Sequence, residues 1–383
     1  MNKNKFHLVK SKMTKLSSYH MMIVSKHFNT IKDFINIEFV SKKFNDNMKK
    51  FHFNPIPITK LTIKHFPNIE TLHLYNKTDE NFGNGFIDNL KNDNHDYYEE
   101  INKRKSVTEK KVFYQIVVWF GVGVDVVNRT ISPNIKFKNV IYTKDDVTKF
   151  GNKIPNSVKT IDDYCFNRYN KLDCINIPPN VKSIGDHCFC NCLNLTSVTI
   201  SSGVKTISRS CFSYCIHLLE IKIPLSVKSM ADDCFYNCYN LSSVEISTNV
   251  TSIGNCCFFG CCALSYVTIP NNVLSMGKGC FFNCCFLETI SIPSSVTSIG
   301  IQCFGNCSQL NSVYIQPGVE QFYYQCFGGC IQLTHVDIPI SVTSIGDKCF
   351  FKCNSLTKLI IPSSVVSISS DCFPSNTLVI QEK

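Results

Sequence analysis

The stretch IPSSVTSIGIQCFGNCSQLNSVY, residues 292–314, decides the fold because the chain repeats it at a fixed interval. Related stretches begin every 23 residues from Ile154 to Ile361, with no insertion or deletion between them. They form nine full copies and a truncated tenth, which share the pattern I-P-x-x-V-x-x-I-G-x-x-C-F-x-x-C-x-x-L-x-x-V-x. An unbroken period of this length predicts a solenoid in which each copy makes one coil.

Each part of the unit predicts a local structure. The L-x-x-V-x-I run has the alternation of a strand whose parallel neighbours come from the adjacent coils. Proline follows this run in seven of the ten units, and it stops the strand because it has no N–H for the ladder. The V-x-x-I-G run predicts a second short strand, and C-F-x-x-C predicts one or two helical turns. We therefore expect an α/β fold, a right-handed solenoid of short parallel strands with short helices on its convex side.

Charge and cysteine content divide the chain near residue 150. Residues 1–153 carry 26 Lys and Arg against 15 Asp and Glu, whereas residues 154–383 carry 13 against 14. All 23 cysteines lie between Cys165 and Cys372. This asymmetry predicts three regions. They are a basic helical region over 1–60, an irregular capping region with strands over 61–153, and ten repeats over 154–380.

Two small helices are expected in the first region, before a break at Pro55 and Pro57. Ser17 or Ser18 would cap the first helix. The apolar residues expected on their inner faces are Tyr19, Met22 and Ile23 in the first, and Phe34, Ile37 and Phe44 in the second. Helices ahead of repeats allow an F-box-like adaptor, and the lysine excess allows weak contact with an acidic surface. We favour a solvated face that caps the repeat stack, and we expect no nucleic acid as a partner.

The longest apolar run, VFYQIVVWFGVGVDVV over residues 112–127, is interrupted by Gln115 and Asp125. It is too short for a bilayer core of about 30 Å, and its β-branched and aromatic content predicts a buried strand or hairpin. We expect no transmembrane segment. The first 28 residues never hold seven apolar residues in a row, so no secretory signal is visible. This favours a cytoplasmic, reducing location, with the cell surface as the alternative.

The cysteines follow the period. With the opening Ile as position 1, cysteine occupies position 12 in all ten units and position 16 in eight. The position-12 residues are Cys165, Cys188, Cys211, Cys234, Cys257, Cys280, Cys303, Cys326, Cys349 and Cys372. The position-16 residues are Cys192, Cys215, Cys238, Cys261, Cys284, Cys307, Cys330 and Cys353. Cys174, Cys190, Cys256, Cys262 and Cys285 fall outside these two rows.

Four uses of the thiols remain open at this point. A zinc site needs four ligands in a tetrahedron, and no histidine accompanies the pairs. Disulfides between coils are within reach but need an oxidising compartment. Nucleophilic catalysis needs one activated thiol with a base. We favour packing, in which the thiols act as small apolar groups, and we expect no metal and no cofactor.

Candidate partner-binding residues lie between the buried residues of the long strand, on the side expected to be concave. Aromatic residues dominate the energetics of protein interfaces, which singles out Tyr266, Tyr314 and His335. The charged candidates of the same strip are Glu220, Glu245 and Asp337. An evenly solvated polar face is the alternative interpretation. The chain contains no P-loop, G-x-S-x-G, H-E-x-x-H or G-x-G-x-x-G motif, so we expect no enzymatic activity.

The consensus I-P-x-x-V-x-x-I-G-x-x-C-F-x-x-C-x-x-L-x-x-V-x-I-P resembles the BspA-like, or Treponema-type, leucine-rich repeats. Residues 31–58, 66–82 and 140–158 also resemble the N-terminal segment of protist members. The resemblance implies a leucine-rich-repeat solenoid that acts as a non-enzymatic scaffold for a protein partner. A surface adhesin or antigen and the F-box-like adaptor are the alternatives. The chain departs from the bacterial pattern in placing cysteine where alanine is usual before Phe.

Overall fold

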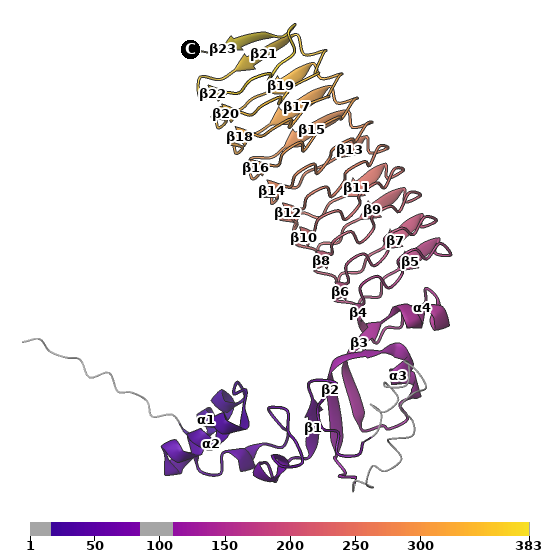
Figure 1. Ribbon diagram of the computed structural model, residues 1–383, viewed down its shortest axis with the longest axis vertical. Helices are drawn as coiled ribbons and strands as arrows, with labels where there is room; N and C mark the ends of the chain where they lie inside the picture. The colour runs from indigo at the N-terminus through magenta and orange to yellow at the C-terminus, as the bar shows by residue number, and fades with distance from the viewer. Residues whose placement is uncertain (1–16, 85–109, 383) are drawn as a thin grey trace, which may run out of the picture. The chain divides into compact units, whose positions relative to one another are not determined.

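The computed structural model describes residues 17–84 and 110–382. The chain divides into two compact units, one up to Asn139 and one from Val140 onward. The first unit is a small mixed structure, and the second is a stack of coils (Figure 1).

The first unit begins with two helices at the predicted places, α1 (Ser18–Ser25) and α2 (Ile31–Val40). The Ser17 hydroxyl caps α1, and Thr30 with Asp33 forms a capping box at α2. The remaining elements are the 3-10 turns η1 (Lys42–Phe44), η2 (Met48–Lys50) and η3 (Ile63–His65), the strands β1 (Thr71–Leu74) and β2 (Gln115–Gly123), and α3 (Val124–Arg129). Strands β1 and β2 pair in parallel.

Three expectations for this unit are wrong in detail. Tyr19 and Ile23 are exposed, and α1 instead buries Met21 and Ser25. A polar contact explains which face of α1 is buried. The Ser25 hydroxyl accepts a 3.0 Å hydrogen bond from the Asn47 side chain, so the face of the helix that carries Ser25 is buried. Phe44 is buried in η1, beyond the end of α2. The 112–127 run forms a strand followed by a helix, since β2 leads directly into α3.

The second unit contains the repeats. It is entered through β3 (Ile135–Tyr142) and α4 (Lys144–Phe150), where Thr143 and Asp146 form the capping box that ends the strand and starts the helix. The long strands are β5 (Cys174–Asn176), β7 (Ser197–Thr199), β9 (Glu220–Lys222), β11 (Ser243–Glu245), β13 (Tyr266–Val267), β15 (Thr289–Ile292), β17 (Ser312–Ile315), β19 (His335–Asp337), β21 (Lys358–Ile361) and β23 (Leu378–Gln381). The short strands are β4 (Val158–Ile161), β6 (Ser183–Ile184), β8 (Thr206–Ile207), β10 (Ser229–Met230), β12 (Ser252–Ile253), β14 (Ser275–Met276), β16 (Ser298–Ile299), β18 (Gln321–Phe322), β20 (Ser344–Ile345) and β22 (Ser367–Ile368).

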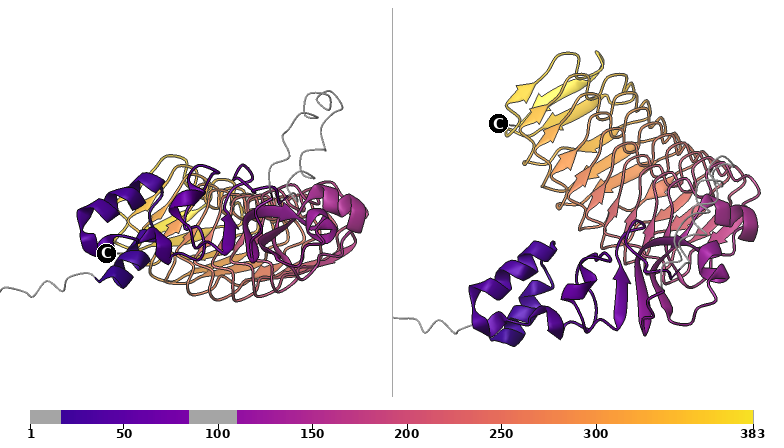
Figure 2. Two further views of the ribbon diagram at one scale, coloured as in Figure 1. Left: turned by 90° about the horizontal axis from the view of Figure 1, so that it is seen from below. Right: turned by 60° about the horizontal axis from the view of Figure 1, so that its bottom comes forward.

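Neighbouring coils pair in parallel with the register of the period. Ser229 pairs with Ser252 in the short strands, and Ser243 pairs with Tyr266 in the long strands. The two sets of strands therefore run along two sides of the stack (Figure 1, Figure 2). The predicted solenoid of parallel strands is confirmed.

The short helices expected at C-F-x-x-C are wrong, because in the described repeats this segment is a run of turns. In the second coil, His187 and Asn191 take the left-handed φ values of 53° and 59°. Between them the N–H of Phe189 donates to the carbonyl of Cys211, one coil further on, at 2.8 Å. An α-helix would use these N–H groups within its own segment. The turns direct them to the next coil, so this side of the stack also gains an inter-coil ladder.

The solenoid core is built from rows of side chains, one for each buried position of the repeat. The phenylalanines that follow the position-12 cysteines stack from Phe166 to Phe373, with centroids 5.1–5.8 Å apart and planes within 16° of parallel. Tyr142 continues the row ahead of the first repeat, 5.9 Å from Phe166. Beside this row lie the buried thiols of positions 12 and 16.

Candidate functional site

All six predicted partner-binding residues lie on one side of the solenoid, here called the long-strand face. It consists of the outward side chains of strands β9 to β19, in coils three to eight. The strands alternate exposed, buried, exposed, as in β9, β11 and β19, so every second side chain points outward. Glu220, Glu245, Tyr266, Tyr314, His335 and Asp337 are therefore presented on a common surface.

The acidic end of the long-strand face is a hollow of about 470 Å³ that Glu220, Lys222, Ser243 and Glu245 line. Lys222 and Glu245 pair in register, and the Lys222 Nζ lies 2.8 Å from the Glu245 Oε1. Both side chains are largely exposed, so this pair adds little stability. Glu245 is thus already partnered, while the structure places Glu220 in the same hollow as a second carboxylate.

The aromatic end is a smaller hollow of about 190 Å³ between coils five and seven, lined by Tyr266, Ser291 and Tyr314. The Tyr266 hydroxyl accepts a 3.0 Å hydrogen bond from Thr268, yet the residue is 63% exposed. The rings of Tyr314 and His335 lie 5.8 Å apart.

His335 is also placed beside an acid, because its Nε2 lies 2.9 Å from the Asp337 Oδ1. Tyr314, His335 and Asp337 therefore form one contiguous group at this end of the face. Their exposed rings and paired charges are features that protein interfaces use.

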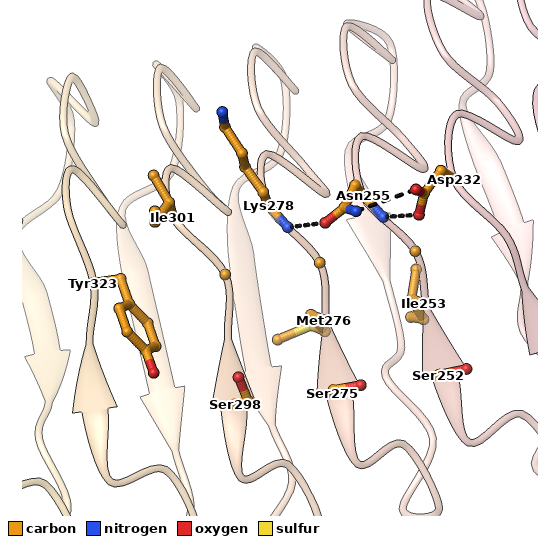
Figure 3. A pocket seen from close by; sticks show the side chains of 13 residues that line it. Asp232, Ser252, Ile253, Asn255, Ser275, Met276, Lys278, Ser298, Ile301 and Tyr323 are labelled. Atoms are coloured by element: carbon orange, nitrogen blue, oxygen red, sulfur yellow. Dashed lines mark hydrogen bonds between the residues drawn. The ribbon is translucent and has the colours of Figure 1, made fainter.

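A second surface was missed by the sequence reasoning. It is a groove of about 510 Å³ along the short strands β12, β14 and β16, shown in Figure 3. The hydroxyl groups of Ser252, Ser275 and Ser298 line one edge. On the other edge the Asn255 N–H donates to Asp232, and the Lys278 N–H donates to Asn255, at 2.7 and 2.8 Å.

The groove exists because position 9 is glycine in three successive coils, Gly254, Gly277 and Gly300. A Cβ on Gly277 would come within 2.4 Å of the Asn255 backbone, so the close approach of the coils requires glycine there. Tyr323 takes position 9 in the next coil and closes the groove. The glycine row was visible in the sequence and was the signal for this surface.

A row of lysines is the other missed feature. Position 6 is lysine in the first four coils, and the residues are Lys159, Lys182, Lys205 and Lys228. Their backbones are in register, since the Lys182 N–H donates to Lys159 at 2.8 Å and the Lys228 N–H donates to Lys205 at 2.9 Å. Within the described part of the chain none of the four makes an ion pair. The repeat region is therefore locally basic, although its overall charge is close to balanced.

The thiols are more than apolar filler. Each of the eight position-16 cysteines donates its S–H to the carbonyl of a phenylalanine one coil earlier, at 3.0–3.3 Å. These phenylalanines, here called the ladder phenylalanines, are those of the stacked row. Tyr169 replaces this cysteine in the first coil, and in the last coil the Asn376 side chain donates to Asn354 instead. The thiol is thus small enough for the core and still satisfies a buried acceptor.

Burial governs the ionisation of these thiols. It raises the pKa of Cys192 to about 12 and the pKa of Cys215 well above its ordinary value. For Cys285, burial and a hydrogen bond with Cys262 raise the pKa to about 11. A raised pKa keeps a thiol protonated near neutral pH, whereas metal ligands and nucleophiles need the thiolate. Among the described residues, no group of three or more His, Cys, Asp and Glu side chains is placed to hold a metal ion.

The coil geometry defines the chain as a solenoid of the leucine-rich-repeat class. The sequence profile of the BspA type leucine rich repeat region matches residues 138–261 and 228–353, with six copies. Because these matches span more than half of the chain, the protein belongs to the BspA-type leucine-rich repeat family. The resemblance noted in the sequence is confirmed.

One solved structure supports this assignment, and two others are reported beside it as similar chains. A leucine-rich repeat protein from Bacteroides ovatus is similar over 70% of this chain and 68% of its own, with 25% identity and a TM-score of 0.51. The T. pallidum leucine-rich repeat protein is similar over 51% of this chain and 82% of its own, with 23% identity and a TM-score of 0.42. A leucine-rich cell surface protein from Faecalibacterium prausnitzii is similar over 71% and 88%, with 25% identity and a TM-score of 0.34.

Comparison with curated proteins gives no match. In the described residues, every helix is too short or too polar to cross a membrane.

Proposed function

We propose that the protein is a non-enzymatic scaffold that binds a protein partner through its long-strand face. The family to which it belongs suggests a role in protein interaction or at a surface. The observation that carries the proposal is the common exposure of the six side chains on the long-strand face, where Glu220 and Glu245 line one hollow and Tyr266 and Tyr314 line another. Aromatic anchors beside charged pairs fit a protein surface rather than a small substrate.

The two tyrosines of the aromatic hollow test this proposal. Immobilised full-length protein should retain a defined partner. The double variant Tyr266→Ala/Tyr314→Ala should bind the same partner at least tenfold more weakly, because exposed aromatic anchors concentrate binding energy. The matched control is Tyr214→Ala/Tyr239→Ala, which removes two tyrosines of similar exposure from the turn segments. The choice of face would be contradicted if both double variants bound the partner as tightly as the wild type. It would also be contradicted if both weakened binding to the same extent.

We also propose a reducing, cytoplasmic location for the protein. Support comes from the eight position-16 thiols, which can donate to the phenylalanine carbonyls only while they are reduced. Thiol titration of the denatured protein without reductant should find about 23 free groups. A largely oxidised count would favour the surface adhesin instead. Imaging of the tagged protein gives an independent answer. The adaptor role of residues 1–60 stays a prediction.

A further inference from the structure

Two of the five cysteines outside the rows meet across a coil boundary. Cys262 and Cys285 both occupy position 17, in coils five and six, and their Sγ atoms lie 3.7 Å apart. Both are half-buried, unlike the position-16 thiols immediately before them in the sequence, which are buried. This is a pair of thiols that solvent can reach.

The surroundings of the pair direct both sulfurs to one place. The backbone carbonyl of Asn283 accepts from each thiol at 3.5 Å, and the Asn283 amide lies 3.8 Å from the Cys262 sulfur. Adjacent coils of a parallel ladder lie about 4.8 Å apart, which is within the Cα separation that a disulfide spans. Bringing the sulfurs from 3.7 Å to a bond of about 2.05 Å needs side-chain rotation and no change of register.

We propose that Cys262 and Cys285 form a redox modification site that closes into an inter-coil disulfide when hydrogen peroxide is present. Cys262 gives up its proton, and its sulfur attacks a peroxide oxygen and displaces hydroxide, which leaves a sulfenic acid. The second sulfur attacks that sulfur, the S–S bond forms, and water leaves. Over both steps the two thiols lose two protons and two electrons, and the peroxide becomes two molecules of water.

The other cysteines of the described repeats do not offer this reaction. The thiols of positions 12 and 16 and the Cys190 thiol are buried, and the position-16 thiols donate to carbonyls. Cys174 is exposed, but no second thiol lies within hydrogen-bonding reach of it. Cys256 has the same intermediate exposure as Cys262 and also lacks such a partner thiol. Selectivity thus follows from exposure and pairing together.

The bond would join the coils at a break in the long-strand ladder. Strands β9, β11 and β13 form one hydrogen-bonded sheet, and β15, β17 and β19 form another. The break between β13 and β15 separates coil five from coil six, and Cys262 and Cys285 each lie four residues before the strand of their coil. Oxidation would therefore tie together the two sheets that carry Tyr266 and Tyr314.

Mass spectrometry of the reduced full-length protein, treated with hydrogen peroxide and then alkylated, tests the proposal. We expect one cross-linked peptide pair, Cys262 with Cys285, and a fall from 23 to 21 free thiols that dithiothreitol reverses. Phenylarsine oxide, a probe that bridges two neighbouring thiols, should protect the same two residues from alkylation without any oxidation.

Two variants sharpen the result. Cys285→Ser should abolish the cross-link and the arsenical protection, and Cys262 should then be trapped as a sulfenic acid by dimedone. Cys256→Ser, from the same coil and with the same intermediate exposure, should behave like the wild type. Retention of both Cys262 and Cys285 as free thiols under conditions that oxidise Cys174 would overturn the proposal, and so would a cross-link between other cysteines.

Discussion

The main phenylalanine clusters of the two units pack in opposite ways. In the solenoid the ladder phenylalanines lie almost parallel, and Phe281 and Phe304 differ by only 1°. In the N-terminal unit Phe34, Phe51 and Phe66 meet edge to face at 77–81°. A 23-residue period places the same side chain at the same point of every coil, so neighbouring rings can only stack with an offset. Without a period each ring is free to take the edge-to-face contact.

Buried polar groups follow the same division. In the solenoid, side chains satisfy carbonyls of the neighbouring coil, as Cys307 does for Phe281 at 3.1 Å. In the N-terminal unit one side chain serves several nearby groups, because the Asn54 amide donates to Ile56 and His73 and accepts from the His73 N–H. Repetition spreads the interactions evenly over the coils, whereas the irregular unit concentrates them in a few residues.

The largest expected effect is the loss of a ring in the middle of the ladder. Phe281→Ala should lower the free energy of unfolding by about 3–5 kcal/mol, the usual range for a buried Phe, because the ring stacks on neighbours on both sides. Phe373→Ala, at the half-buried end of the row, should have a much smaller effect. Denaturant unfolding measures both.

Phe34→Ala carries the comparison into the other unit. The free energy of unfolding of that unit should fall by a similar amount, and hydrogen exchange should rise in α1, α2 and β1 while the coils stay unaffected.

Equal losses of stability for Phe281→Ala and Phe373→Ala would contradict the stacking account.

The next effect separates the two rows of thiols. Cys307→Ala should destabilise the protein by about 1–2 kcal/mol, since it removes a buried sulfur and one of the two donors to the Phe281 carbonyl, which keeps only the Cys284 N–H at 3.2 Å. Cys303→Ala should cost less than about 1 kcal/mol, because this position-12 thiol donates to no carbonyl in the described structure and acts as a small apolar group. Unfolding in reductant measures the difference. If Cys307→Ala is as mild as Cys303→Ala, the thiol–carbonyl bonds contribute nothing.

One pH effect should arise in the N-terminal unit, from His73. Burial, and then the charge of Lys138, lowers the pKa of His73 from 6.5 to about 4. As the pH falls below 6.5 the unfolded chain takes up this proton first, so stability is full above pH 6.5 and declines toward pH 4. His73→Gln should remove that decline, as measured by thermal unfolding between pH 4 and 7.

NMR titration of His73 supplies a check on the cause of the shift. Lys138→Gln should raise the pKa of His73. The pH range over which stability declines should then be narrower. An unchanged pKa would remove the electrostatic contribution of Lys138.

The smallest expected effect concerns the lysine row. Lys205→Thr introduces the residue found at position 6 in coils five, seven and nine. It should raise the free energy of unfolding by a few tenths of a kcal/mol at low salt, because like charges at the same position of adjacent coils repel. The gain should disappear in about 1 M salt, where the screening length is about 3 Å. Lys222→Thr, which removes a lysine paired with Glu245, is the matched control and should bring no gain.

Sequence reasoning was accurate wherever the period itself carries the information. The coil boundaries, both kinds of strand and the inward rows of Phe and Cys follow from spacing alone. The six candidate residues could be assigned to one face because strands alternate inward and outward. The turn helices were wrong because C-F-x-x-C satisfies a helical spacing locally, while the left-handed residues at positions 11 and 15 divert the N–H groups to the next coil. The groove was missed because the position-9 glycines were interpreted only as residues that let the chain turn after the short strand.

The sequence by itself determined that the chain is a solenoid, how many coils it has and which side chains fill its core, because a strict period allows each coil only one environment. Tertiary structure decided what stacking brings together. The position-16 thiols reach a carbonyl one coil earlier, the glycine row opens a groove, and Cys262 meets Cys285, which lies 23 positions further along the chain. These contacts join residues in different coils, and their distances depend on the register and separation of the coils.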